Sequence, residues 1–189
     1  MKSNPRPSPG AHPIREGTVR ALRDGGDVFR SVADAVARGI ADAVRGAGRV
    51  GVATADVVSG VAGSAVQGTL EAGGDLRLAS RGIAVGVLRG SRKTGGAALR
   101  MLREAAKTVI RQTARRGGDS ARAAAGLLEG LLDRARALGL RVGPSAALLA
   151  RDLADAAEEF GASAAEEVRA AAAGILGGVR RATGTTSKN

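Results

Sequence analysis

The chain has 189 residues, no cysteine and one histidine, so disulfide bonds, thiolate metal sites and thiol catalysis are excluded. It has 29 glycines and only two aromatic residues, both phenylalanine, so a core must rely on close packing of small side chains. The formal net charge of +11 at pH 7 favours a partner with an anionic surface.

Residues 1–16 are predicted to be a disordered tail, because four of the five prolines fall within the first thirteen residues. This stretch has no apolar run of the kind that a secretory leader needs. Residues 183–189 have a similar composition and are predicted to be a second tail. We therefore expect a cytoplasmic protein, either free or at the periphery of a membrane, a granule or the nucleoid.

Residues 17–142 are predicted to be a helical repeat region. A glycine returns every 22 residues without insertion or deletion, at Gly51, Gly73, Gly95, Gly117, Gly139 and Gly161. A fixed period of this size is typical of repeat proteins. Between these glycines apolar residues recur at spacings of three and four, as on one helix face, for example at Leu76, Ile83, Val87, Leu88, Leu102, Val109, Ile110, Leu127, Leu131 and Leu132. The expected fold class is all-α, built from tandem 22-residue (2 × 11) Ala/Gly-rich amphipathic repeats.

The glycine pairs decide whether these repeats form separate helices or one long helix. Gly25-Gly26-Asp27, Gly73-Gly74-Asp75 and Gly117-Gly118-Asp119 indicate a helix end followed by a capping Asp. Gly95-Gly96-Ala97 has no such cap, and two glycines inside a helix would cost only about 2 kcal/mol relative to alanines. An uninterrupted helix, however, would leave its whole apolar stripe in water. We favour separate helices, hinged or broken at the glycine pairs, and the continuous helix is the alternative.

The stretch 51–70 has about the length of a membrane span and contains only one charged residue, Asp56. Its Ala, Gly, Ser and Val residues are only weakly hydrophobic, so we do not expect it to insert. Gly60, Ser64 and Gly68 are spaced by four and would let two helices approach closely. The alternative is a stripe that becomes ordered only on a lipid or granule surface.

The positive charge is concentrated in residues 77–116, where Glu104 is the only acidic residue. The basic residues of this segment are the candidate contacts with an anionic surface: Arg77, Arg81, Arg89, Arg92, Lys93, Arg100, Arg103, Lys107, Arg111, Arg115 and Arg116. Those from Arg100 to Arg115 are spaced by three or four residues and share one helix face, opposite Leu102 and Val109. Like charges at this spacing destabilise a helix by about 0.2–0.5 kcal/mol per pair, so the face suits an anionic partner. The alternative is a face that is simply solvated.

Residues 144–182 are predicted to form one C-terminal helix, which begins at Gly143-Pro144-Ser145 because proline suits the first turn of a helix. The segment 145–169 is acidic, with Asp152, Asp155, Glu158, Glu159, Glu166 and Glu167 against Arg151 and Arg169. This acidic helix could fold back beside the basic one and partly mask its charges. Helix pairing within one chain, or between copies of it, is therefore a further expectation.

No arrangement of residues predicts catalysis, a metal site or a cofactor. The single histidine, His12, lies in the predicted N-terminal tail, and the serines have no histidine base on a predicted helix. There is no His/Cys cluster for a metal ion. The glycine-rich stretches around Gly82 and Gly95 do not match a Walker phosphate loop and follow no predicted strand. We expect a protein that is not an enzyme.

The stretches VVSGVAGSAVQGTLEAGGD (57–75) and RKTGG (92–96), with a recurring glycine and no aromatic residue, carry a resemblance to known proteins. Over residues 51–138 the chain resembles the eleven-residue-repeat proteins that coat lipid, the perilipin-like and synuclein-like families. The resemblance implies a long amphipathic helix that forms on lipid, with basic residues near the headgroups. The chain departs from these families in its doubled glycines, its arginines in place of lysines, and its acidic C-terminal helix.

Three classes of function follow. The first is a peripheral coat on an anionic membrane, lipid droplet or storage granule, held by arginines near the surface. The second is a nucleoid-associated protein that binds duplex DNA without sequence specificity, since nothing in the chain would read bases. The third is a self-assembling helical scaffold. The first is the favoured hypothesis.

Overall fold

A computed structural model describes residues 15–16, 19, 27–46, 53–91 and 95–184. The predicted N-terminal tail therefore lies outside the described residues except for Arg15 and Glu16, and so does the C-terminal tail from residue 185. The candidate contacts Arg92 and Lys93 and the glycine pair Gly25-Gly26 also lie outside them.

The described residues form seven α-helices and no strand, so the expected all-α class is confirmed. In chain order they are α2 (Val28–Gly46), α3 (Ala53–Glu71), α4 (Leu76–Gly90), α5 (Gly95–Arg115), α6 (Ser120–Ala135), α7 (Val142–Glu158) and α8 (Ala162–Gly184). A short 3-10 helix, η1 (Arg136–Leu138), follows α6.

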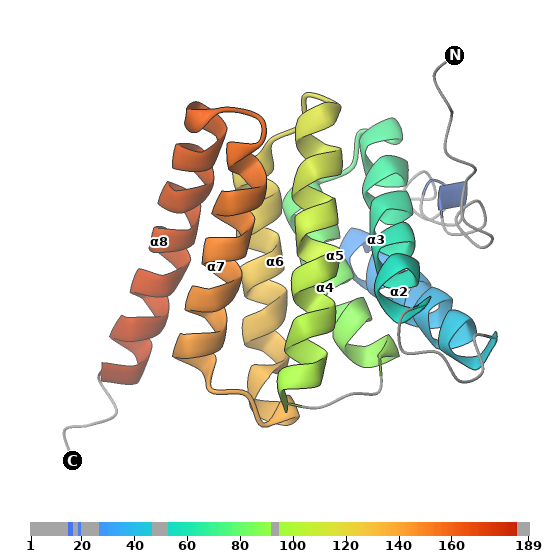
Figure 1. Cartoon of the computed structure of the whole chain (residues 1–189), viewed down its shortest axis with the longest axis horizontal. Helices are drawn as coiled ribbons and strands as arrows, with labels where there is room; N and C mark the ends of the chain where they lie inside the picture. Colours follow the sequence, from blue (N-terminus) through green and yellow to red (C-terminus); the bar gives the residue numbers. More distant parts are fainter. Residues whose placement is uncertain (1–14, 17–18, 20–26, 47–52, 92–94, 185–189) are drawn as a thin grey trace.

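The helices form two layers that lie face to face (Figure 1). In the first layer α4 packs mainly against α2 and α6, and α6 packs against α8 as well. In the second layer α5 packs against α3 and α7. The chain alternates between the layers and reverses at each turn, so neighbours within a layer are parallel and lie two helices apart in the sequence. At the lower end of this slab in Figure 1, α4, α6 and α8 end and α5 and α7 begin; we call the opposite end the upper end.

The turns at the upper end explain why the chain reverses there. Gly73 follows α3 with a φ of +65°, a left-handed conformation that glycine adopts without steric cost. The N–H of Gly74 donates to the carbonyl oxygen of Thr69 at 2.9 Å, which closes the helix end in a Schellman motif. The carboxylate of Asp75 then accepts the N–H of Leu78 at 3.0 Å and begins α4. The turn between α5 and α6 has the same contacts, which are made by Gly117, Gly118 and Asp119.

Glycines inside the helices let the parallel helices of the first layer approach until their backbones touch. A Cβ atom at Gly86 in α4 would lie 2.7 Å from the carbonyl oxygen of Ala33 in α2. One at Gly126 in α6 would lie 2.1 Å from the carbonyl oxygen of Arg77 in α4. No side chain fits at either distance. Close approach of the helices therefore compensates for the small number of large apolar residues. The core is filled by alanine, valine, leucine and isoleucine.

The apolar positions that the spacing picks out do face the core. Those of α4, α5 and α6 named above are all buried except Leu132, which is half-buried. On α5, Leu102 and Val109 are completely buried and lie opposite the basic face, as predicted. The amphipathic stripes are therefore covered by neighbouring helices rather than left open.

The predicted single helix over 144–182 is wrong. The chain forms two helices there, α7 and α8, because Gly161 takes a φ of +121° and reverses the direction after α7. Gly161 stands between helix formers and is followed by no Asp, so the local sequence lacks the cap that follows Gly74 and Gly118. Pro144 does lie in the first turn of α7. Within the described residues, which include α3 in the weakly apolar stretch 51–70, no helix is long and apolar enough to cross a membrane.

Candidate anion-binding surface

The predicted contact residues are divided between the two layers. Arg77, Arg81 and Arg89 belong to α4 in the first layer, whereas the six from Arg100 to Arg116 belong to α5 and the residue after it in the second. Each group pairs with acidic residues of its own layer. The basic segment 77–116 is continuous in the sequence but does not form one continuous surface in the fold.

The arginines of α4 bind carboxylates on both neighbouring helices. Arg81 donates from Nε and Nη2 to the two carboxylate oxygens of Asp133 in α6, at 2.7 and 3.0 Å. This bidentate hydrogen bond raises the pKa of Arg81, whose guanidinium also lies 5.2 Å from the ring centroid of Phe29 in α2. Arg77 binds Glu129 one turn earlier, and Arg89 donates to Asp34 of α2 at 2.9 Å. These side chains link three parallel helices.

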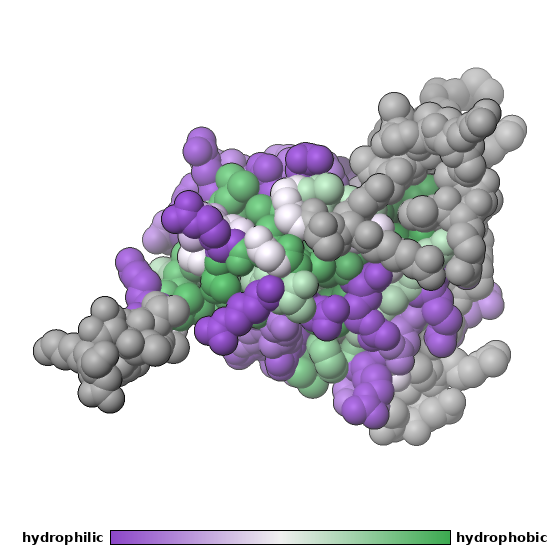
Figure 2. Space-filling model, turned by 90° about the horizontal axis from the view of Figure 1, so that it is seen from below, coloured by the Kyte–Doolittle hydropathy of each residue, from purple (hydrophilic) through white to green (hydrophobic). Residues whose placement is uncertain are grey.

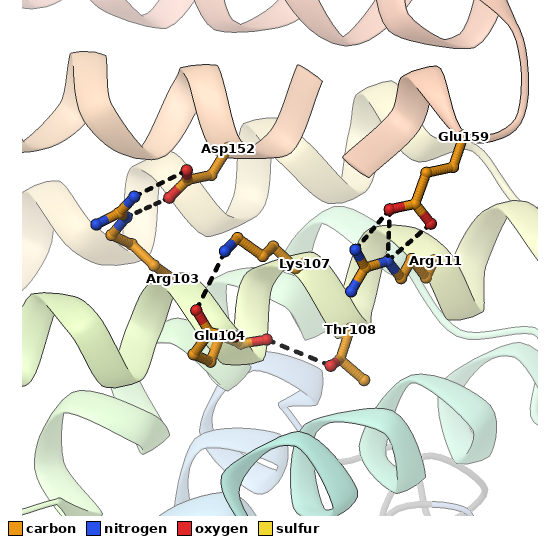
Figure 3. A network of polar contacts seen from close by, with 7 residues as sticks. All are labelled: Arg103, Glu104, Lys107, Thr108, Arg111, Asp152 and Glu159. Atoms are coloured by element: carbon orange, nitrogen blue, oxygen red, sulfur yellow. Dashed lines mark hydrogen bonds and ion pairs between the residues drawn. The ribbon is translucent and has the colours of Figure 1, made fainter. Parts of the chain in front are cut away.

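The basic face of α5 is partly neutralised by α7, as Figure 3 shows. Arg103 donates from Nη2 to Asp152 at 2.9 Å and also from Nε to the second carboxylate oxygen. Arg111 donates from Nε to both oxygens of Glu159, at 2.9 and 3.0 Å, and this hydrogen bonding lowers the pKa of Glu159. The acidic helix therefore lies beside the basic one and masks two of its five aligned charges. Lys107 is paired within α5 with Glu104, at 3.1 Å.

Few of the predicted contacts remain without an acidic partner. Among the described residues, Arg100 and Arg115 form no ion pair, and Arg116 donates to the amide oxygen of Gln112. Arg100 lies near the lower end of α5 and Arg115 at its upper end, about 22 Å apart at the rise of an α-helix. The predicted stripe is therefore interrupted in its middle by bound acids, and only its ends are available.

A second group of arginines, which the sequence analysis did not single out, lies at the lower end. Arg134 lies in the last turn of α6, and Arg136 and Arg141 lie in the connector to α7; none of the three forms an ion pair with a described residue. Arg180 and Arg181 lie in the last turns of α8, which end at the same side. The negative ends of the helix dipoles favour cations at this end, which is a sufficient structural reason for the presence of some of these arginines. The acids Asp42 and Asp56 near this end belong to α2 and α3, on the far side of the slab.

The upper end has the opposite character. The helix-capping Asp27, Asp75 and Asp119 lie there, as do the acidic residues Glu158, Glu159, Glu166 and Glu167 around the turn from α7 to α8. The slab is thus polarised along its helix axes. A sequence signal for this polarity exists: Arg136 and Arg180 are 44 residues apart, the length of one helical hairpin, and so lie on the same side of the fold.

The lower end also presents apolar residues between its arginines. Leu138, Leu140 and Val142 of the connector are half-buried, and Gly139 between them has a φ of +65° that reverses the chain. Viewed from this end, Figure 2 has a band of hydrophobic surface between two hydrophilic borders. The Nε atom of Arg134 is buried without a hydrogen-bond partner. Arginines flanking a partly exposed leucine loop are the residue types found where proteins meet a membrane interface.

Nothing in the described part of the chain groups three or more histidine or acidic residues around a possible metal position. Comparison with protein families and with curated proteins gives no match. The resemblance to perilipin-like and synuclein-like coats therefore remains a prediction from sequence pattern.

Proposed function

We propose that this protein is a non-enzymatic array of 44-residue helical hairpins that docks on an anionic membrane, lipid droplet or storage granule through its lower end. The docking surface consists of Arg134, Arg136 and Arg141 around Leu138 and Leu140. The observation that carries the proposal is that arginines without an ion pair among the described residues coincide with partly exposed leucines at the end of α6 and on the connector that follows it. Turn glycines with positive φ at Gly73 and Gly117, 44 residues apart, support the hairpin repeat.

The basic face of α5 is a weaker candidate for this role than the connector. Two of its arginines are bound by Asp152 and Glu159. The apolar stripe that a coat helix would insert into lipid is filled here by Leu102 and Val109, both fully buried, so insertion would require the two layers to separate. The connector needs no such opening. Each arginine near an anionic surface contributes on the order of 1 kcal/mol, and the leucines add apolar contact.

The experiment that tests this function is co-sedimentation with vesicles of phosphatidylcholine containing phosphatidylserine, using two matched variants. Arg136→Gln with Arg141→Gln removes two charges from the lower end, and Arg115→Gln with Arg116→Gln removes two from the upper end. We expect the first pair to weaken binding by about tenfold or more, since two such charges are lost, and the second pair to change it much less. Equal weakening by both pairs would mean that only net charge matters and would overturn the proposed site.

The same variants distinguish a duplex-DNA partner from a lipid one. Phosphates of DNA would attract the same arginines, but binding would fall steeply with salt and would not depend on Leu138 and Leu140. Replacing both leucines by serine should weaken vesicle binding at high salt, where only apolar contact persists. Binding to DNA with no binding to vesicles would make the nucleoid alternative the correct one. Binding to neither would favour the scaffold.

A further inference from the structure

Among the described residues, one face of α8 has no neighbouring helix. α8 lies at the edge of the first layer and packs against α6 and α7 through residues such as Ala165, Val168 and Ala172. Its opposite side carries Ala170, Ala173 and Gly174, which are exposed, and a Cβ atom at Gly174 would meet open space. Alanine and glycine have no polar side-chain group, so this part of the helix does not present a polar surface to water.

Elsewhere in this protein, small residues at the corresponding positions form helix contacts. Gly126 and Gly130 of α6 press against the backbone of α4, and Ala170 and Gly174 follow them by 44 residues. In α8, however, the corresponding face is turned away from α6, and no other described helix covers it. The chain therefore repeats on its edge helix a surface that it otherwise uses to bring two helices into close contact.

The charges on this face of α8 indicate which partner would fit it. Glu166 and Glu167 are exposed at the start of α8, and Arg180 and Arg181 are exposed near its end. The midpoint between the two groups falls at Ala173 and Gly174. A second α8 placed antiparallel, with its midpoint on the same residues, would bring each acidic group opposite the basic group of its partner. A parallel arrangement would place like charges together, which is unfavourable.

We propose that this face of α8 is a homodimer interface, in which two copies of the chain pair antiparallel about a two-fold axis at Ala173 and Gly174. Glu166, Ala170, Ala173, Gly177 and Arg180 follow a spacing of four and three and lie along the line of contact. The small residues at its centre allow the two helices to approach closely. A two-fold axis makes the interface self-complementary, as closed homodimers require.

The size of the interface sets the expected affinity. The contact line from Glu166 to Arg181 is about 22 Å long at 1.5 Å per residue, and one helix face against another is at the small end of specific interfaces. We therefore expect an equilibrium between monomer and dimer that depends on protein concentration. Dissociation should increase with ionic strength, because the pairs at both ends are exposed.

Charge reversal tests the antiparallel arrangement. The variant Glu166→Arg with Glu167→Arg, and the variant Arg180→Glu with Arg181→Glu, each place like charges opposite one another and should weaken the dimer by about tenfold or more in sedimentation equilibrium. The chain with all four substitutions restores opposite charges across the axis and should recover the dimer. Reversal also disturbs the helix dipole and the 3.7 Å contact of Glu166 with Arg169, but the fourfold variant does not repair these local effects.

A steric variant provides a second, independent readout. Gly174→Leu places a large side chain on the proposed axis and should abolish the dimer without affecting the fold, since that position has open space within one chain. Ala147→Leu, at an exposed position of α7, is the matched control and should leave the dimer intact. A chain that is monomeric at all concentrations, or a dimer that persists in Gly174→Leu or is not rescued in the fourfold variant, would overturn the proposal. These measurements contain no lipid, so their outcome is separate from that of the docking surface.

Discussion

Arg103 of α5 and Asp152 of α7 form a two-point contact between the basic and the acidic helix, in which both oxygens of the carboxylate accept hydrogen bonds. The side chain of Asp152 is only 10% exposed and that of Arg103 28% exposed, so among the described residues this is the most buried ion pair between helices. A charge-assisted, bidentate pair in this position orients α7 against α5 more strongly than the exposed pairs do.

Replacing Asp152 by alanine should therefore destabilise the fold. We expect the free energy of unfolding to fall by about 1–2 kcal/mol, because a partly buried guanidinium loses its acceptor. The measurement is urea denaturation followed by circular dichroism. Asp155→Ala is the control: Asp155 is 62% exposed and lies 3.9 Å from Arg151, so its removal should cost at most about 0.5 kcal/mol. Equal effects of the two substitutions would contradict the role given to Arg103 and Asp152.

A pair of glycine substitutions tests the close packing of the first layer. Gly126→Ala would place a Cβ atom 2.1 Å from the carbonyl oxygen of Arg77, so α4 and α6 must separate, at a cost of about 1–3 kcal/mol. Gly174→Ala introduces the same atom into open space within one chain and should stabilise α8 by up to about 1 kcal/mol. Thermal unfolding of both variants at low protein concentration should give shifts of opposite sign. A stabilised Gly126→Ala variant would mean that these helices are not in backbone contact.

The turn at Gly117 provides a third test. Its φ of +68° is unfavourable for any residue with a Cβ atom, so Gly117→Ala should lower the free energy of unfolding by about 1 kcal/mol. The helical content should not rise, because the chain must still reverse for α6 to reach α4. A variant with greater helicity and a longer hydrodynamic shape would instead indicate that the helix runs through this position.

The pH dependence of stability should report the contact between Arg111 and Glu159. Hydrogen bonding to Arg111 lowers the pKa of Glu159 in the folded protein below its ordinary value of 4.5. As the pH falls, the unfolded chain therefore binds the proton before the folded protein does. The stabilisation that the contact with Arg111 supplies is present above the ordinary pKa and is lost as the pH falls through the pKa of the folded protein. Glu159→Gln should remove this part of the acid-induced loss of melting temperature. If the difference in melting temperature between neutral pH and pH 3 were the same in Glu159→Gln as in the unchanged chain, the role given to Glu159 would be contradicted.

The sequence was sufficient to predict the all-helical class and the buried face of α5, but not which helices become neighbours. The glycine period, the Asp caps at Asp75 and Asp119 and the buried face of α5 depend on local spacing and backbone preference. The ion pair of Arg103 with Asp152, in contrast, depends on helices two elements apart becoming parallel neighbours, which is set by how their surfaces pack. The lower-end arginines were missed for the same reason: Arg136 and Arg180 lie at the same end of the slab only once the helices are stacked.

The failed prediction of one helix over 144–182 has a local cause. Gly161 is followed by alanine rather than by a capping side chain, so the sequence contains the glycine that permits a reversal but not the residue that begins the next helix. The reversal brings α8 onto α6 and buries Ala165 and Val168. Burial of that face outweighs continuation of α7 as a straight helix, which would leave these residues in water.

The most direct test of the docking surface is to locate the part of the chain that meets lipid. Because the chain has no cysteine, single cysteines can be introduced at the exposed Ala137 of the lower connector, at Ala162 of the upper end and at Glu104 on the basic face of α5, and each can be spin-labelled. With anionic vesicles, the proposed orientation predicts that the label at residue 137 enters the headgroup region and is relaxed by lipid-soluble oxygen, while the other two remain accessible to an aqueous reagent. Insertion of the label at residue 104, with residue 137 left in water, would contradict it.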